Sequence, residues 1–354
     1  MLDKVSVAVI GATGAVGQRF IQMLNEHPWF SADVLAASDK TAGKKYGEIV
    51  KWNLSTKMPD YVFEEEIHNI EPEIFKNKGI ELIFSALPAD IARDIEPKMA
   101  AAGFKVFSNA SAYRMAENVP LLIADVNPVH LDLVVEQQKV TPGFLVTNPN
   151  CCVTGLATVL QPINEQFGIK SVIVSTYQAL SGAGYPGVPS MDIIGNVIPY
   201  IADEEDKMEN ECQKILGSFS NTEITPSNFE VIANCTRVPV RDGHLEAVTV
   251  ELTQDASLDE FKESLSSFDG LNNRTLPTAP QNAIILTNDE NRPQPMFDLQ
   301  NGSPLRAKGM AVTTGRFKKF GNKIRFFLLV HNTIRGAAGC SIMNAELAKH
   351  EGFI

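Results

Sequence analysis

The sequence predicts a doubly wound α/β domain followed by an α+β domain with a mixed sheet, because strand and helix signals are arranged differently in its two halves. Strand-like and helical segments alternate between Val5 and Thr147, which is typical of a parallel sheet covered by helices. After residue 228, long strand-like segments follow one another with one helical segment among them, which indicates a mixed or antiparallel sheet. The 354 residues are enough for two such domains.

A glycine-rich turn follows the first predicted strand. The buried strand 5–10 leads into Gly11-Ala12-Thr13-Gly14-Ala15-Val16-Gly17, and a helical pattern continues through Phe20 and Leu24. Glycines let the backbone approach a pyrophosphate closely, and the amides at the helix start face the anion. This context predicts a Rossmann-like dinucleotide-binding domain; a tight turn without a ligand is the alternative.

The next strand, 32–37, ends in a segment that distinguishes between the two nicotinamide cofactors. Asp39 lies there among Ser38, Lys40, Lys44 and Lys45. An acidic residue at this point commonly binds the ribose hydroxyls of NAD, whereas hydroxyl and basic groups accommodate the additional phosphate of NADP. The surrounding serine and lysines predict NADP; the alternative is a solvated lysine loop.

Two further strands, 81–86 and 105–108, direct their carboxyl ends to the edge of the sheet where ligands gather. Leu87 follows the first strand, and a loop ending in Arg114 follows the second. We interpret Arg114 as a candidate ligand for an anionic substrate group. An exposed loop arginine without a ligand is the alternative.

The last strand of this half, 144–147, leads directly to two adjacent cysteines. Apolar residues recur at helical spacing from Val153 to Ile163, which predicts a helix that starts at Cys151, with Asn150 as its polar N-cap. Unpaired amides and the helix dipole favour an anion in the first turn, so Cys151 is a candidate reactive thiolate. The alternative is that Cys151 and Cys152 are small buried apolar residues.

The second half predicts strands and helices of a different order. A helix at 203–215 begins with an acidic turn, and small residues begin a terminal helix at 334–346 that we expect to return to the first domain. We therefore assign residues 1–150 and 332–354 to the dinucleotide-binding domain and 151–331 to a second domain, for which the family resemblance given below implies catalysis and dimerisation. The predicted strands of the second domain are 171–178, 229–233, 244–252, 311–317 and 324–330, with a helix at 258–268.

Composition excludes several classes of function. The formal net charge of -11 argues against a nucleic-acid-binding protein. The five cysteines are odd in number and show no C-x-x-C spacing, so we expect no metal site and a reducing cytoplasmic setting. Lys4 and a predicted strand follow the N-terminus directly, without the apolar segment of a signal peptide, and no uninterrupted apolar run is long enough to span a bilayer.

His244 is the histidine whose position is most suggestive of a base for a thiol nucleophile. It follows a tight turn at 241–243, and Arg237 precedes it by an odd number of residues. In one regular strand these two side chains would lie on opposite faces, so we expect the turn to redirect one of them. The alternative is a structural histidine.

Several motifs occur together in an order that resembles one family. The chain is similar over nearly its whole length to aspartate-semialdehyde dehydrogenases of the archaeal and fungal branch. The matching motifs are G-A-T-G-A-V-G from Gly11, S-N-A-S-A-Y-R-M from Ser108, N-P-N-C from Asn148, Q-A-L-S-G-A-G-Y from Gln178, E-E-D-K-M from Glu204, R-V-P-V-R-D-G-H from Arg237 and H-N-T-I-R-G-A-A-G from His331.

The resemblance implies a role for each matching residue. Cys151 is expected to be the nucleophile, His244 the general acid/base and Gln178 a residue that positions the acyl group. The expected substrate-binding residues are Arg237 for the α-carboxylate, Glu204 for the α-ammonium group, and Arg114 and Lys207 for the phosphate, with Asn150 close by. The residues predicted to bind the cofactor are Gly11, Thr13, Gly14, Ala15, Val16, Gly17, Ser38, Lys40, Ser85, Leu87, Gly182 and Asn332.

The implied reaction is NADPH-dependent reductive dephosphorylation of L-4-aspartyl phosphate to L-aspartate 4-semialdehyde, in the biosynthesis of lysine, methionine and threonine. A cysteine thioester would split it into two easier steps. The resemblance also implies a homodimer or homotetramer formed through the second domain.

Three alternatives remain open at this stage. An acyl-CoA reductase, such as malonyl-CoA reductase, would keep the cysteine, histidine and arginine but needs neither Glu204 nor Lys207. A non-catalytic NADP-binding sensor would be expected to lack Cys151 or His244, and both are present. The residue after the expected nucleophile is Cys152, where the family more commonly has serine or threonine. Cys152 is therefore the rival candidate for the reactive thiol.

Overall fold

The computed structural model describes residues 4–354, which form two compact units. The first unit extends to Leu122 and also contains Val129–Asn148 and Ser341–Ile354. The second unit contains Ile123–Pro128 and Pro149–Cys340. The end of the chain therefore belongs to the first unit, whereas residues 332–340 belong to the second.

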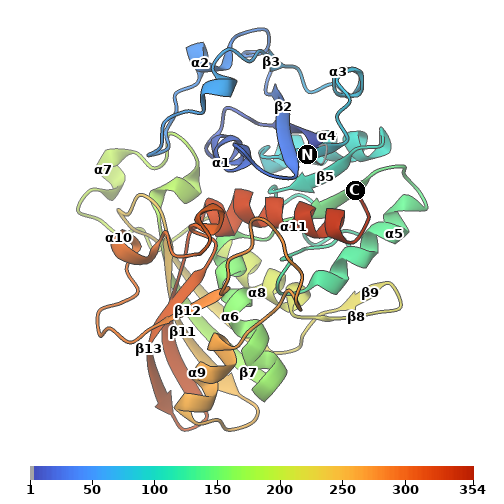
Figure 1. Ribbon diagram of the computed structural model, residues 1–354. Helices are drawn as coiled ribbons and strands as arrows, with labels where there is room; N and C mark the ends of the chain where they lie inside the picture. Colours follow the sequence, from blue (N-terminus) through green and yellow to red (C-terminus); the bar gives the residue numbers. More distant parts are fainter. Residues whose placement is uncertain (1–3) are drawn as a thin grey trace. The chain divides into compact units, whose positions relative to one another are not determined.

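The first unit contains a six-stranded sheet in the order β3-β2-β1-β4-β5-β6, and every pair of neighbours is parallel (Figure 1). This confirms the predicted doubly wound, Rossmann-like sheet. Strand order reverses between β1 and β4, and ligands bind at such a switch point beside the carboxyl ends of the strands. The strands are β1 (Val5–Ile10), β2 (Phe30–Ala36), β3 (Ile67–His68), β4 (Leu82–Ser85), β5 (Lys105–Ser108) and β6 (Phe144–Thr147).

The core of this unit is continuous because the strands are apolar along their length. Ala8, Ile10, Val34 and Ile83 are buried in one cluster, and the ring of Phe84 stacks on Phe20 at 4.9 Å on the other side of the sheet. Parallel strands covered on both faces need such runs. The helices are α1 (Ala15–Leu24), α2 (Tyr46–Ile49), α3 (Pro72–Asn77), α4 (Ala89–Ala101) and α5 (Leu133–Gln138), with short 3₁₀ turns at Asp60–Val62 and Pro128–Asp132.

The terminal helix α11 (Gly339–His350) is tied to the first unit by a fully buried pair. His27 Nε2 and Glu346 Oε1 lie 2.8 Å apart, and neither side chain is exposed. The helical segment begins as a π-helix, Ile334–Ala338, before α11 takes over. The predicted start at Ile334 is confirmed, although its first turns are wider than an α-helix.

The second unit contains a six-stranded mixed sheet in the order β10-β7-β11-β14-β13-β12. β10 and β7 are parallel, β11 is antiparallel to both β7 and β14, and β12 is parallel to β13. The predicted mixed sheet is therefore confirmed. The strands are β7 (Ile169–Gln178), β10 (Glu230–Arg237), β11 (His244–Leu252), β12 (Ile284–Thr287), β13 (Val312–Phe320) and β14 (Lys323–Val330), with a separate hairpin of β8 (Ser218–Ser220) and β9 (Glu223–Thr225).

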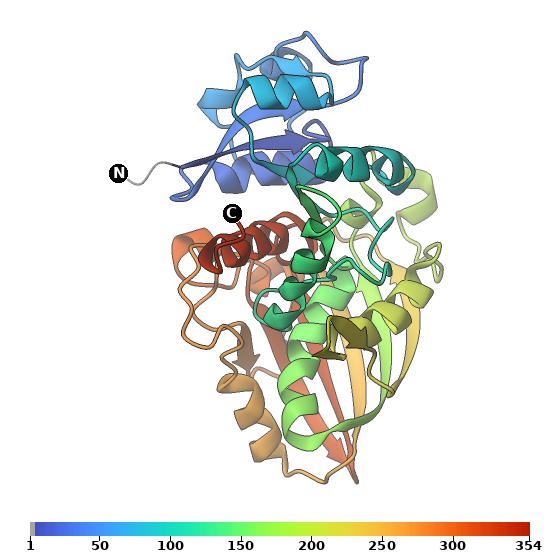
Figure 2. The same cartoon turned by 90° about the vertical axis from the view of Figure 1, so that its right-hand side faces the viewer.

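Helices cover one face of this sheet, and the other face is open. In β11, buried residues alternate strictly with partly exposed ones. Figure 2 shows the long helix α6 lying along the sheet. On the uncovered face Ile173 and Ile232 remain 45% and 41% exposed. The helices are α6 (Cys151–Phe167), α7 (Ser190–Ile193), α8 (Glu204–Ile215), α9 (Leu258–Ser266) and α10 (Pro295–Asp298), with 3₁₀ turns η3 (Leu180–Ala183) and η4 (Leu305–Ala307).

No helix within residues 4–354 combines the length and apolar character required to cross a lipid bilayer.

A buried carboxyl supports the loop after β5. Ser108 Oγ donates a hydrogen bond of 2.6 Å to Oε1 of Glu96 on α4 and accepts one of 3.0 Å from the amide of Ala110. Glu96 is completely buried. Burial raises the pKa of this carboxyl above its usual 4.5, against the smaller lowering effect of its hydrogen bonds and of the Arg114 charge.

The first prediction concerns the turn between β1 and α1. An added Cβ on Gly17 would lie 2.3 Å from the carbonyl oxygen of Gly11, and neither backbone can move freely. Gly17→Ala should therefore destabilise the protein by about 2 kcal/mol or more, measured by urea unfolding. Gly14→Ala, whose Cβ would meet its nearest neighbour at 3.5 Å, is the matched control. Equal stability of the two variants would contradict the steric explanation.

The second prediction concerns Glu96. Because its folded pKa is raised, the native state holds a proton that the unfolded chain has released above about pH 4.5, so this group contributes less stability as pH rises from there. Glu96→Gln removes that dependence and keeps an acceptor for Ser108. The free energy of unfolding of the variant, relative to the parent, should rise between pH 5 and pH 8. A pH-independent difference between Glu96→Gln and the parent would refute the assignment.

Candidate active site

The start of α6 is fixed by the side chain of Asn150. Its Oδ1 accepts hydrogen bonds from the amides of Cys152 at 2.8 Å and Val153 at 3.3 Å. The predicted N-cap and the predicted helix start at Cys151 are both confirmed. Because the cap uses the second and third amides of the helix, Cys151 occupies the first helical position, where the dipole favours an anion.

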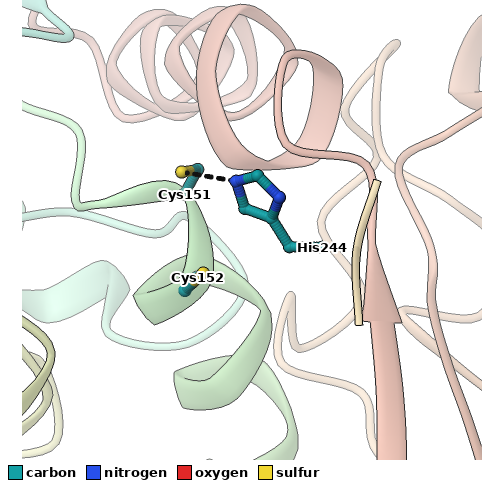
Figure 3. A group of neighbouring side chains, drawn as sticks. All are labelled: Cys151, Cys152 and His244. Atoms are coloured by element: carbon teal, nitrogen blue, oxygen red, sulfur yellow. Dashed lines mark hydrogen bonds between the residues drawn. The ribbon is translucent and has the colours of Figure 1, made fainter. Parts of the chain in front are cut away.

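Cys151 and His244 are in direct contact. Figure 3 shows the Cys151 sulfur pointing at the imidazole, and Sγ lies 3.1 Å from Nε2. On the other side of the ring, Nδ1 accepts a hydrogen bond of 3.0 Å from the backbone amide of Ala179. A nitrogen that accepts from an amide carries no proton, so the neutral ring carries its proton on Nε2 and presents it to the sulfur.

Gln178 lies between Arg237 and His244 on one face of the sheet. Arg237 on β10 pairs with Gln178 at the end of β7, and on the opposite side Leu245 of β11 pairs with Tyr177. His244 is therefore opposite Gln178, and directly paired residues of neighbouring strands share a face.

This arrangement corrects the expectation that a turn redirects one of the two side chains. Arg237 and His244 belong to strands on opposite sides of β7, so their odd spacing in sequence does not decide their faces. Residues 238–243 cross the end of β7, where the amides of Leu180 and Ser181 donate to the carbonyls of Val240 and Arg241. The crossing brings both side chains to one site without a reversal of either.

The loop after β7 closes over these residues. Arg237 Nη1 donates 2.7 Å to the carbonyl of Ala179, and an added Cβ on Gly182 would lie 2.9 Å from that nitrogen and 3.3 Å from Nε2 of His244. Asn332 accepts from the amide of Gly243 and donates to Ser181 Oγ, each at 2.8 Å. Gly182 and Asn332 thus belong to the surroundings of the Cys151–His244 pair, which we call the thiol centre. Their contact with the cofactor stays a prediction.

Glu204 also reaches the thiol centre. It is the first residue of α8 and only 7% exposed, and its carboxyl interacts with the side chains of Asn150 and Gln178. Burial, followed by the neighbouring Cys151, raises its pKa above the usual 4.5. Lys207 lies one turn further along α8 and is partly exposed; its contact with a phosphate stays a prediction.

The two adjacent sulfurs have different surroundings. Cys152 is completely buried, whereas Cys151 is partly exposed. Burial raises the pKa of the Cys152 thiol well above its usual 9.0, and interactions with Cys151 and Glu246 raise it further. These surroundings favour Cys151 as the reactive sulfur.

Gly336 was not predicted to belong to this site. A Cβ on Gly336 would lie 2.8 Å from the Cβ of Cys151, so only glycine allows the π-helix to pack against the first turn of α6. The adjacent Arg335 is fully buried and donates to Asp125 at 2.7 Å and to Thr158 at 2.8 Å. The run of small residues was the available signal, but it did not name the partner.

Glu246 is a second unpredicted residue. It follows His244 by two positions in β11, so it lies on the same buried face. It is fully buried, both carboxyl oxygens lack a hydrogen-bond partner of normal geometry, and burial raises its pKa well above 4.5. The alternation of the strand was the signal that could have found it.

The first unit carries the remaining candidate residues at the carboxyl ends of its strands. Helix α1 begins after Gly14 without a side-chain cap, so its first amides are available to an anion. Gly11 and Gly17 hold the turn tightly, as a pyrophosphate cradle requires. Thr13, Ala15 and Val16 are partly exposed in this turn, and Ser38 and Lys40 are exposed after β2. Ser85, the last residue of β4, is fully buried, and Leu87 follows it. Arg114 is 8% exposed and donates a hydrogen bond of 2.8 Å to the carbonyl of Asn109.

Family models match both halves of the chain. Residues 6–134 match the semialdehyde dehydrogenase NAD-binding domain, and residues 160–335 match the semialdehyde dehydrogenase dimerisation domain.

Individual relatives cover nearly the whole chain. An aspartate-semialdehyde dehydrogenase of Archaeoglobus fulgidus is 50% identical over 99% of this chain and 100% of its own length. A malonyl-CoA reductase (NADP) of Metallosphaera sedula is 37% identical over 100% and 99%, respectively. The crystal structure of aspartate-semialdehyde dehydrogenase with NADP from Candida albicans matches with a TM-score of 0.90 at 36% identity, covering 99% of this chain and 100% of that one. The chain belongs to the aspartate-semialdehyde dehydrogenase family.

Proposed function

We propose that the chain catalyses the NADPH-dependent reductive dephosphorylation of L-4-aspartyl phosphate to L-aspartate 4-semialdehyde, through a thioester on Cys151. The observation that carries this proposal is the contact of 3.1 Å between Cys151 Sγ and His244 Nε2 at the start of α6. Relatives named for the same activity, such as the 50% identical archaeal enzyme, support it.

In the first step the Cys151 thiolate attacks the acyl carbon and displaces phosphate. The helix start and the Nε2 proton of His244 both favour the thiolate over the thiol. A new sulfur–carbon bond forms as the carbon–oxygen bond to phosphate breaks, and the electron pair leaves with the phosphate. Gln178, paired with both Arg237 and His244 on the sheet, is placed to orient the acyl group.

In the second step the thioester is reduced and the aldehyde leaves. NADPH, when bound, supplies the hydride for this reduction. The carbon–sulfur bond then breaks, its electron pair returns to Cys151, and His244 acts as the acid through Nε2. Nδ1 cannot take this part because it accepts the hydrogen bond from the amide of Ala179. The Cys151 amide at the helix start adds a donor for the developing oxyanion, and such a donor is worth about 3–4 kcal/mol in other enzymes.

The ends of the substrate have complementary partners. The planar guanidinium of Arg237 suits the α-carboxylate, and the buried carboxyl of Glu204 suits the α-ammonium group, whose positive charge would keep that carboxyl ionised. Arg114, Lys207 and Asn150 are assigned to the phosphate on the family resemblance alone.

The environment of Glu204 also separates this function from acyl-CoA reduction. A malonyl-CoA thioester carries no ammonium group, so it leaves a buried carboxylate beside Cys151 without a counter-ion. The Glu204 carboxyl, which interacts with Asn150 and Gln178, therefore favours a substrate with an ammonium group. The substrate in the name of the 37% identical malonyl-CoA reductase has none.

The residues of the first unit fit NADP. The uncapped start of α1 suits the pyrophosphate, and exposed Ser38 and Lys40 suit the additional phosphate. The solved relative from Candida albicans contains NADP.

We assign the chain to a homodimer formed through the open face of the second sheet. The match to a dimerisation domain and the exposed Ile173, Tyr177 and Ile232 support this assignment. None of the five cysteines forms a disulfide in the structure, which fits a reducing cytoplasm, and Cys151 must stay reduced for catalysis.

The nucleophile is tested by two serine substitutions. Cys151→Ser should lower kcat by about 10⁴-fold or more, since nucleophile replacements in other enzymes lose activity on this scale. Cys152→Ser should leave most of the rate, because Cys152 is completely buried whereas Cys151 is partly exposed. Steady-state assay of both variants checks this, and the reverse pattern would assign the reaction to Cys152.

The substrates are tested by assay in the direction of oxidation. Purified protein with aspartate semialdehyde, phosphate and NADP should form NADPH, with a higher kcat/KM for NADP than for NAD. Parallel assays with NAD, and with malonyl-CoA plus NADPH, are the controls. Turnover on malonyl-CoA without turnover on the semialdehyde would overturn the substrate assignment.

A further inference from the structure

We propose that Cys151, Cys152 and His244 form a binding site for a thiophilic divalent metal ion, for which Zn²⁺ is the best candidate. The bound ion would block the nucleophile reversibly. Metal binding itself does not depend on the proposed reaction. Only the inhibition that follows from it rests on the role of Cys151.

The three ligand atoms already lie close together. The two sulfurs and a ring nitrogen of His244 are all within 4.8 Å of one another (Figure 3). In tetrahedral zinc sites with Zn–S near 2.3 Å and Zn–N near 2.0 Å, neighbouring ligand atoms are separated by about 3.5 to 3.8 Å. Changes of an ångström or less, achieved by rotation of the cysteine side chains, would therefore bring all three into the coordination sphere.

The donor set matches the ion in charge and in softness. Two thiolates cancel the charge of a divalent cation. The imidazole adds no charge if its proton moves from Nε2 to Nδ1 on binding, which gives up the hydrogen bond from the Ala179 amide. The occupied site is then neutral and suits a buried position. Thiolate and imidazole are ligands that Zn²⁺ prefers. Gly182, whose added Cβ would lie 3.3 Å from His244 Nε2, is exposed, so water can reach the site and complete the tetrahedron.

The groups around the site also favour a cation. Glu246 lies fully buried and interacts with Cys152, and Glu204 interacts electrostatically with both sulfurs. These carboxyl groups, from β11 and α8, oppose an isolated negative charge on Cys152. A bound cation would offset this repulsion, because its positive charge is attracted by the carboxyl groups and by the Cys152 thiolate that ligates it.

Cys152 is what distinguishes this site from the ordinary cysteine–histidine pair of a thiol enzyme. A pair alone offers two ligands, and Cys152 supplies the third. Within the described residues 4–354, this is the one group of three potential ligand residues with such spacing. The sequence did not predict it, because two adjacent cysteines and a histidine from a distant strand match no metal-binding motif.

Binding releases protons, which gives a readout that is independent of turnover. Each thiol that ligates the ion must lose its proton to solvent. The parent protein should therefore release one proton more per ion than a variant that lacks Cys152. Because ligation displaces protons, affinity should increase with pH.

The test is a titration of the full-length protein with Zn²⁺ alone, with Co²⁺ as its spectroscopic substitute, under reducing and chelator-free conditions. Calorimetry in buffers of different ionisation enthalpy counts the protons, and the cobalt–thiolate absorption reports the number of sulfur ligands. Cys152→Ala is compared with Cys212→Ala, which replaces another fully buried cysteine. Cys152→Ser provides a second variant if the alanine form does not fold.

We expect Cys152→Ala to lower zinc affinity by at least about tenfold, since ligand losses should exceed the 10–100-fold cost of outer-shell changes. It should also weaken the cobalt–thiolate absorption and release one proton fewer, whereas Cys212→Ala should match the parent. In the parent, Zn²⁺ should inhibit turnover and EDTA should restore it. Equal affinity, absorption and proton release in the parent and Cys152→Ala would refute the site, as would the absence of cobalt binding by the parent. Binding without inhibition would instead contradict the catalytic role of Cys151.

Discussion

The hydrogen bonds from the amides of Cys152 and Val153 to Asn150 are the constraint on which the candidate active site depends. They start α6 at one residue and so fix where the sulfur of Cys151 lies. A helix that began one residue later would place that sulfur outside the first turn and away from His244. The cap also orders Asn150 itself, whose backbone amide donates to Glu211 on α8 at 2.6 Å. The position of Cys151 and the position of the acidic helix α8 beside it are therefore coupled.

The second sheet complements this cap from the opposite side. Because β7 lies between β10 and β11, the side chains of Arg237, Gln178 and His244 lie next to one another on one face of the sheet. An amide, a guanidinium and an imidazole are thereby aligned without a flexible loop having to hold any of them. The loop that does cross the site is restrained by backbone hydrogen bonds and by Asn332. Rigid strands thus provide the precision, and the loops provide the closure.

Much of the fold followed from local patterns, whereas the arrangement of the site did not. The start of α6 and the strand–turn–helix at Gly11–Gly17 were predictable because capping and glycine-rich turns are local in sequence. The position of Gln178 between Arg237 and His244 was not, because strand pairing across the sheet is decided by packing of the whole unit. For the same reason the sequence named Gly336 as a small residue but not Cys151 as its neighbour. Glu246 was readable from the alternation of β11, yet a buried acid contradicts the usual preference for apolar residues there.

The contact of Gly336 with Cys151 has a consequence for the order in which the protein becomes active. A ribosome synthesises Cys151 long before Gly336 and before β14, which pairs with the strand that carries His244. Until that last part of the chain emerges, the cysteine lacks one wall of its surroundings and the histidine strand lacks a neighbour. The nascent chain therefore carries an incomplete thiol centre during most of its synthesis, and chains that terminate before the π-helix remain without a working one.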